Sequence, residues 1–406
     1  MPVWRLSNPV QHYDWGSPDY IPELLGSSEP DARPVAELWL GAHPKAPSLL
    51  GIADQQIPLD QFIASNPEAI LGKAMQLYDG RLPFLFKVLA AESPLSIQAH
   101  PSKAQARLGF ARENALRVPP DAPQRNYRDD NHKPELICAL TPFTMLCGFR
   151  AYADICHDFR SLGLDSFFST FGAFAKFGDQ RSFQLLMIQI LMLPKERAGE
   201  VLRHLAQALA EDAGLPALTR ETVFLLLDAY PGDIGALAPL YLNLRLLQPG
   251  EAVFLGPGIP HAYLHGAGLE LMANSDNVLR GGLTPKHMDI EELARILDFS
   301  PYYPASLPCR QESAELRTYE SPAEEFSLSA ISLEGGSLEL DTRQMPVILL
   351  CLEGAATLRA EAVELELTRV GSAFVSADTG PYSLSGSARL WAATVPPLKT
   401  ETPLRK

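Results

Sequence analysis

The chain has 406 residues, which is more than one hydrophobic core of usual size and predicts two or three domains. Hydrophobic residues make up 46% and charged residues 20%, the balance of an ordinary globular protein. The formal net charge of −14 argues against a nucleic-acid partner, because binding to a phosphate backbone needs a concentrated basic face. A small phosphorylated substrate stays compatible with this charge, since it needs only a few local cations.

The five cysteines lie far apart and show no CxxC spacing, so we expect reduced thiols. The first residues contain no apolar stretch flanked by basic residues. The longest apolar runs are broken by charge or proline well short of the length that spans a bilayer. We therefore expect a cytoplasmic protein without a membrane segment.

In the first third of the chain, short apolar runs alternate with turn residues up to about residue 55, which predicts strands and loops. Residues 59–71 have helical spacing. Residues 83–100 are typical of two apolar strands separated by a Glu-Ser-Pro turn, and residues 101–116 of a helix. A polar loop is expected over residues 118–132, followed by a strand over 133–140.

Helical periodicity dominates from residue 152 to about 241, and this shift of pattern predicts an inserted helical domain. Strand patterns return after residue 247 and, apart from one helix over residues 289–297, continue to residue 397. We predict a mainly β fold with an α-helical insertion. Its expected domains are residues 1–150 together with 242–305, the helical residues 151–241, and a second β-domain over 306–406.

The chemistry-bearing residues concentrate around the stretch from residue 256 to residue 286. Proline and glycine residues place His261 at the start of a short strand. Because side chains alternate along a strand, we expect His261, Tyr263 and His265 to share one face. Residues 266–268, Gly-Ala-Gly, are interpreted as a turn, after which residues 269–273 return as the second strand of a hairpin.

Four residues are candidate metal ligands: Gln98 and His100 on one strand, Glu135 on a second, and His261 on a third. Nitrogen and oxygen donors of this kind suit zinc. For a histidine considered alone, a hydrogen-bonded and half-buried ring is the more common situation. Four donors, each at a strand end or turn among polar residues, favour a metal site.

Several cations accompany these donors. Lys87 interrupts an apolar strand, where it either extends to water at the strand edge or is held for an anionic ligand. Arg280 and Lys286 lie in a polar loop, and His132 and Lys133 flank the turn before Glu135. Each is compatible with a solvated charge. A metal together with several cations in one cavity suits a phosphorylated, polyhydroxylated substrate.

The spacing of glycines 250, 256 and 258 before His261 resembles the second motif of the cupin superfamily, although proline is usual where Gly256 stands. Longer motifs make the resemblance specific: PLSIQAHP at residues 94–101, NHKPE at 131–135, PHAY at 260–263 and SDNVLRGGLTPK at 275–286. In this order they are similar to type I mannose-6-phosphate isomerases, over about residues 4 to 300. One departure is Ser102, where the family often has aspartate.

The resemblance implies two cupin-type jelly-roll β-barrels and one Zn²⁺ per chain. It also implies roles for individual residues, which are as follows: zinc ligands Gln98, His100, Glu135 and His261; catalytic Arg280; active-site lysines Lys87, Lys133 and Lys286; pocket-lining Tyr263, Glu270, Ser96 and Trp15. For phosphate binding we expect Lys286 and Ser96, with Lys87 a further candidate. The general base stays open between Glu270 and the His132–Lys133 pair.

The function that we expect is the interconversion of mannose 6-phosphate and fructose 6-phosphate through a cis-enediol, by a monomeric enzyme of carbohydrate metabolism that supplies GDP-mannose biosynthesis. An isomerase of another aldose or aldose phosphate is the closest alternative. A cupin oxygenase would need an iron bound by two histidines and one carboxylate with open positions, which a glutamine ligand and nearby cations disfavour. A non-catalytic sugar-binding module is the third alternative.

Overall fold

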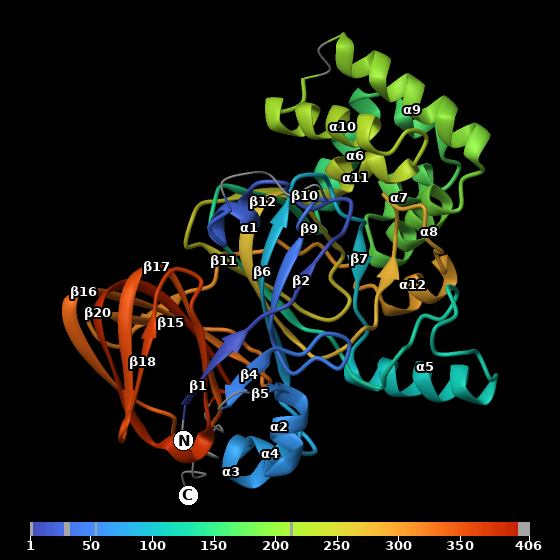
Figure 1. Ribbon diagram of the computed structural model, residues 1–406. Helices are drawn as coiled ribbons and strands as arrows, with labels where there is room; N and C mark the ends of the chain where they lie inside the picture. The colour runs from blue at the N-terminus through green and yellow to red at the C-terminus, as the bar shows by residue number, and fades with distance from the viewer. Residues whose placement is uncertain (1–2, 28–32, 53–54, 212–213, 397–406) are drawn as a thin grey trace, which may run out of the picture. The chain divides into compact units, whose positions relative to one another are not determined.

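The computed structural model describes residues 3–27, 33–52, 55–211 and 214–396 (Figure 1). The chain folds as two compact units. The first comprises Met1–Ala90, Leu269–Asn274 and Leu307–Lys406, and the second comprises Ala91–Gly268 and Ser275–Ser306. Both units contain β-sheet and helices. Among the described residues, no helix is both long and apolar enough to cross a membrane.

The first unit is built on an antiparallel sheet with the strand order β14-β15-β16-β20-β17-β19-β1-β4-β5, and β18 pairs with β17. Buried and exposed residues alternate along much of β16 and β20, so one face of these strands packs on an apolar core. The strands of this sheet are β1(Val3–Ser7), β4(Leu49–Ile52), β5(Gln55–Pro58), β14(Cys309–Gln311), β15(Leu316–Tyr319), β16(Ser327–Asp341), β17(Val347–Ala360), β18(Val363–Leu367), β19(Ser372–Val375) and β20(Pro381–Thr394).

Three further strands of the first unit, β2(Val10–Gln11), β3(Glu37–Gly41) and β6(Phe84–Ala91), pair in that order. The helix expected over residues 59–71 is divided in two, α2(Leu59–Ser65) and α3(Pro67–Leu71). Proline has no N–H to continue a helix but is well suited to a first helical position, so α3 starts afresh at Pro67. The remaining helices of this unit are α1(Tyr20–Leu24), α4(Ala74–Leu77) and the 3₁₀ turn η3(Ala377–Thr379).

Strand β12 belongs to both units, with residues 261–268 in the second and residues 269–273 in the first, and the strands of the second unit converge on it. It pairs with β9, β8 and β7, while β10 pairs with β9, β11 with β8 and β13 with β7. The bounds of these strands are β7(Gln98–Ala99), β8(Glu135–Ala139), β9(Phe143–Phe149), β10(Leu242–Leu247), β11(Ala252–Leu255), β12(His261–Ala273) and β13(Leu279–Arg280). The predicted strand before His100 is therefore regular over only two residues.

The hairpin predicted after His261 is wrong, because β12 continues without a turn from His261 to Ala273. Its glycines serve close packing instead. A Cβ on Gly266 would lie 2.5 Å from the carbonyl oxygen of Pro142, and one on Gly268 would lie 2.8 Å from Cδ1 of Ile137. A register shift between residues 263 and 265 also turns His265 outward, so it does not share the buried face of His261.

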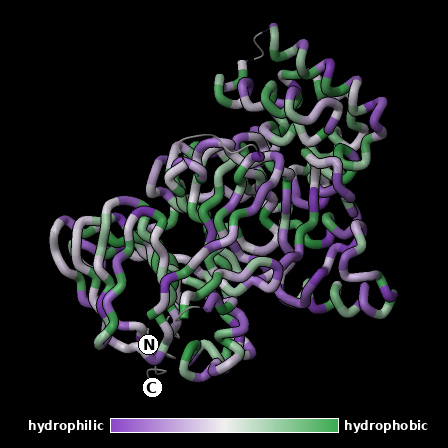
Figure 2. The backbone as a smooth tube through the Cα atoms, viewed as in Figure 1, coloured by the Kyte–Doolittle hydropathy of each residue, from purple (hydrophilic) through white to green (hydrophobic). Residues whose placement is uncertain are grey.

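Helices fill residues 152–241 of the second unit, as the periodicity predicts (Figure 1). Hydrophobic and hydrophilic residues are interleaved along them in Figure 2, and their apolar faces meet in one core. These elements are α6(Tyr152–Ser161), η1(Leu164–Phe167), α7(Phe171–Phe177), α8(Gln180–Leu191), α9(Lys195–Ala210), α10(Ala217–Ala229), η2(Ile234–Leu237) and α11(Ala238–Tyr241).

Two other helices belong to this unit, α5(Lys103–Ala115) and α12(Ile290–Ile296). Ser102 accepts a hydrogen bond from the backbone N–H of Gln105, whose side chain accepts one from the N–H of Ser102. This capping box explains how a serine serves where the family often has aspartate.

The close packing of Gly266 makes a prediction about stability. Gly266 has φ of +113°, and a Cβ there meets the backbone of Pro142, so Gly266→Ala combines backbone strain with a collision. We expect the free energy of unfolding to fall by about 2 kcal/mol or more. The urea midpoint measures this change. Gly199→Ala, in helix α9 with nothing within 4 Å of the new Cβ, is the control and should not lower the midpoint. An unchanged midpoint for Gly266→Ala would contradict the packing argument.

Candidate metal centre

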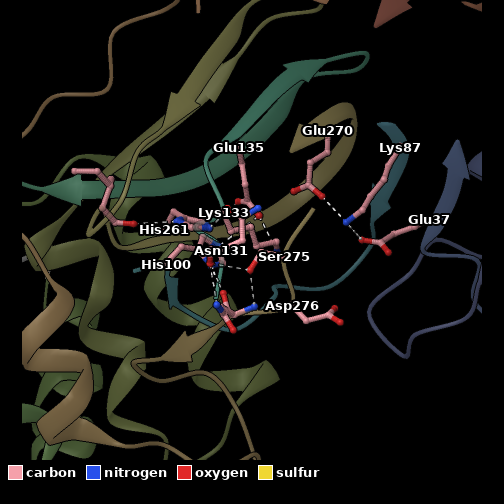
Figure 3. Close-up of polar contacts among 12 residues, drawn as sticks. Glu37, Lys87, His100, Asn131, Lys133, Glu135, His261, Glu270, Ser275 and Asp276 are labelled. Carbon is pink, nitrogen blue, oxygen red and sulfur yellow. Dashed lines mark hydrogen bonds and ion pairs between the residues drawn. The ribbon is translucent and has the colours of Figure 1, made fainter. Parts of the chain in front are cut away.

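Three side chains from separate parts of the sequence meet in the second unit. His100 directly follows β7, Glu135 begins β8 and His261 begins β12. One potential ligand atom from each lies within 4.8 Å of the others, and all three residues are buried (Figure 3). The Nε2 atoms of His100 and His261 lie 3.4 and 3.2 Å from different carboxylate oxygens of Glu135. Three of the four predicted ligands are thus brought together.

The hydrogen bonds of the two rings determine which nitrogens face the carboxylate. Nδ1 of His100 lies 2.7 Å from the carbonyl oxygen of Asn277, and Nδ1 of His261 lies 3.0 Å from that of Ile259. A carbonyl oxygen only accepts, so each Nδ1 carries a proton, and in the neutral form of each ring the lone pair is on Nε2, which faces Glu135. Burial lowers the pKa of His100, which favours this neutral form.

Lone pairs that face a carboxylate repel it unless a cation lies between them. Nε2 of His100 is buried and has no hydrogen-bond partner among the described residues. A buried nitrogen without a hydrogen-bond partner destabilises a folded protein, and a bound ligand removes this cost. Two imidazole nitrogens and a carboxylate oxygen are a donor set that zinc prefers. The residues present therefore fit a bound zinc ion.

Glu135 is kept ionised in spite of its burial. Burial alone raises the pKa of its carboxyl group, but the neighbouring ammonium of Lys133 opposes this effect, and the pKa lies well below its usual range. The ammonium of Lys133 lies 2.9 Å from Oε1 of Glu135. The carboxylate is consequently charged and available as a ligand at neutral pH.

The fourth predicted ligand, Gln98, is positioned by backbone pairing. In β7 it lies opposite His261 of β12 and opposite Arg280 of β13. Gln98 is half-buried, and its amide makes no hydrogen bond within the described part of the chain. The pairing makes Gln98 the cross-strand neighbour of both a candidate ligand and the candidate catalytic arginine.

A buried asparagine, which the sequence patterns did not single out, supports His100. Asn277 is fully buried, and its backbone carbonyl accepts the hydrogen bond from His100. Its side-chain amide donates to the carbonyl oxygens of Asp129 and Asn131 at 2.8 and 2.9 Å. Ser275 joins the same network, because its hydroxyl group donates a hydrogen bond to Oδ1 of Asp129 at 2.8 Å. The polar loop before Glu135 is thus tied to the segment that orients a candidate ligand.

Lys87 and Glu270, both predicted site residues, contact each other in the first unit. The ammonium of Lys87 lies 2.7 Å from Oε2 of Glu270 and 3.4 Å from Oε1 of Glu37, and all three residues are buried (Figure 3). Glu37 also accepts a hydrogen bond from the indole of Trp39 at 2.7 Å. Lys87 therefore does not extend to water. Glu37 was missed in the sequence because it lies in one of the short apolar runs that alternate with turn residues in the first part of the chain.

The two predicted cations Arg280 and Lys286 of the second unit are influenced by a third cation, Arg128. Burial lowers the pKa of Arg280, and the charge of Arg128 lowers it further. Burial likewise lowers the pKa of Lys286, followed by the charges of Arg280 and Arg128. The positive charge of Arg128, a residue of the polar loop before Glu135, thus lowers the pKa values of both Arg280 and Lys286.

The remaining predicted residues fall into both units. In the second, Tyr263 is buried with its ring centroid 6.1 Å from that of His261, whereas Ser96 and His132 are half-buried. The carbonyl oxygen of Tyr263 accepts a hydrogen bond from the N–H of Leu95, which ties the segment before β7 to β12. In the first unit, Trp15 is half-buried and stacks on a neighbouring tyrosine.

Comparison with protein families gives two matches. The model of the phosphomannose isomerase type I catalytic domain matches residues 3–152. The model of the mannose-6-phosphate isomerase cupin domain matches residues 315–395.

Similarity to individual proteins extends over nearly the whole chain. The mannose-6-phosphate isomerase of Salmonella typhimurium is 41% identical over 391 residues, 95% of this chain and 98% of the relative. The human mannose-6-phosphate isomerase is 36% identical over 406 residues, 93% of this chain and 94% of the relative. A crystal structure of zinc-bound, holo mannose 6-phosphate isomerase superimposes with a TM-score of 0.88 at 39% identity, over 97% of this chain and 99% of that one. The chain therefore belongs to the type I mannose-6-phosphate isomerase family of enzymes.

Proposed function

We propose that this protein is a zinc-dependent aldose–ketose isomerase that interconverts mannose 6-phosphate and fructose 6-phosphate. Membership of the family supports the reaction. The observation that carries the proposal is the buried cluster in which two imidazole nitrogens face one charged carboxylate. Such a cluster is unfavourable without a cation and is satisfied by one.

We assign His100, Glu135 and His261, together with Gln98, as the residues that hold the zinc ion. When bound, zinc polarises the substrate oxygens near it and stabilises negative charge without any change of its oxidation state. The hydrogen bonds from the two Nδ1 atoms fix the ring orientations before the metal arrives.

The proposed reaction moves one proton from C2 of the aldose to C1 of the ketose through a cis-enediol, while a second proton passes between O1 and O2. Negative charge develops on these oxygens as the C2 proton leaves. We assign Arg280 to stabilise this charge, because it lies opposite Gln98 in the β7–β13 pairing. Because Arg280 is half-buried, water screens the charge of its guanidinium less than it would screen an exposed one.

The candidates for the general base are Glu270, Lys133 and His132. Glu270 already forms an ion pair with Lys87, and Lys133 forms one with Glu135. If either Glu270 or Lys133 removed the substrate proton, its ion pair would change. Loss of solvent exchange at C2 in one single variant, with substrate binding retained, identifies the base. For substrate binding we retain Lys87, Ser96, Lys286, Tyr263 and Trp15.

We propose that residues 1–150 with 242–305 form a cupin jelly-roll catalytic domain, residues 151–241 an inserted helical domain, and residues 306–406 a second, degenerate jelly-roll. The match of residues 315–395 to a cupin-domain model supports the last of these. We also propose a cytoplasmic monomer that acts on a small sugar phosphate. The five free cysteines are compatible with a reducing compartment.

Zinc removal tests the proposal directly. We expect a strong chelator to abolish formation of fructose 6-phosphate from mannose 6-phosphate, because the ligands alone leave charge on the substrate unstabilised. A coupled assay measures the product, and one equivalent of zinc should restore it. Full activity in a protein shown to be metal-free would contradict the proposal, as would a chain that contains iron and consumes oxygen.

Replacement of Arg280 separates catalysis from binding. In Arg280→Ala we expect kcat to fall about 100-fold or more, with a smaller effect on KM, because the charge that it stabilises develops after the substrate has bound. Steady-state kinetics provides both values. A rise in KM with kcat retained would make Arg280 a binding residue only.

The asparagine that supports His100 gives a prediction about metal affinity. We expect Asn277→Ala to weaken zinc binding about tenfold or more, since the loop hydrogen bonds that hold the support of His100 are lost. Competition with a chromophoric chelator measures this affinity. Asp179→Ala removes the N-cap of α8 in the same unit and serves as a control for general destabilisation, with zinc affinity retained. Equal affinities in the two variants would show that Asn277 does not support the metal site.

A further inference from the structure

Three cationic side chains of the second unit, Arg128, Arg280 and Lys286, interact electrostatically with one another. Within the described residues, none of the three has an ion pair or a side-chain hydrogen bond. This is unusual in a chain with a net charge of −14, where acidic partners are plentiful. Like charges brought together without a counterion repel, so the group has the character of an anion-binding site.

Arg128 is held in this group by its backbone. Its N–H donates to Oδ1 of Asn277 at 2.7 Å, and the N–H of Asp129 reaches the same oxygen at 3.3 Å. Asn277 is fully buried, and only two residues separate it from Arg280. The backbone of Arg128 is thereby joined to the segment that leads into β13.

The same asparagine connects this cationic group to the candidate metal centre. The carbonyl oxygen of Asn277 accepts the hydrogen bond from Nδ1 of His100, while its side chain holds Arg128. Lys286 has its own anchor, because its N–H donates to Oγ1 of Thr284 at 3.1 Å. Backbone hydrogen bonds therefore position two of the cations and leave their charged ends available.

We propose that Arg128 binds the phosphate group of the substrate together with Lys286, and that it thereby helps the enzyme to prefer a phosphorylated sugar. The inference rests on the proposed function. A guanidinium suits this task, since it presents two parallel N–H groups to a phosphate and stays charged at every working pH. Without such a role, Arg128 is a solvated loop charge whose removal has little effect.

Two variants test the role of Arg128. Arg128→Gln removes the positive charge, and Arg128→Lys keeps the charge but lacks the planar guanidinium. We expect Arg128→Gln to raise KM for mannose 6-phosphate about tenfold with a smaller effect on kcat, because a charge-assisted hydrogen bond is lost in both the ground and transition states. Arg128→Lys should retain part of the affinity. Arg107→Gln removes an exposed arginine of helix α5 in the same unit and is the matched control.

A binding measurement keeps this test independent of catalysis. Mannitol phosphate has no carbonyl group and is not isomerised, and mannitol lacks the phosphate. Calorimetric titration of the zinc-loaded protein should show about tenfold weaker binding of mannitol phosphate in Arg128→Gln, and no such loss in Arg107→Gln. Equal affinity in Arg128→Gln and the unmodified protein would overturn the inference, whether or not the protein isomerises mannose 6-phosphate. Loss of binding in a protein without isomerase activity would support the phosphate site and reject only the proposed function.

Discussion

The buried contact between Glu135 and the two imidazoles is the constraint on which the rest of the second unit depends. A charged carboxylate is expensive to bury, and two lone pairs directed at it add repulsion. Lys133 offsets part of the cost on one side. The arrangement becomes favourable once a divalent cation binds, so the structure is organised in advance for a metal. This explains why each ring is held by a carbonyl oxygen on its far nitrogen.

The fold meets this constraint through a few short strands rather than one rigid element. β12 supplies His261, and its pairing with β7 brings Gln98 beside it. β13 then adds Arg280 on the other side of Gln98. The Asn277 side chain joins the polar loop before Glu135 to the segment before β13. Ligand geometry and the placement of cations are consequently coupled through one buried amide.

The sequence was sufficient to find three of the clustered ligands, because histidine and glutamate in specific motifs point to metal chemistry whatever the exact strand geometry. It was not sufficient for Asn277 or Glu37, which are important because they are buried and because of their partners. Asn277 contacts His100, 177 residues away in the sequence, and Glu37 contacts Lys87 on a neighbouring strand. The hairpin prediction failed for a related reason. Glycine permits turns and close packing alike, and only the strands beside Gly266 and Gly268 reveal which of these applies.

Anomalous diffraction at the zinc edge from crystals of the purified protein tests the central claim most directly. The account predicts one peak per chain, within bonding distance of the Nε2 atoms of His100 and His261 and of a carboxylate oxygen of Glu135. A fully occupied zinc ion elsewhere, or an active enzyme with no peak among these three residues, would contradict it.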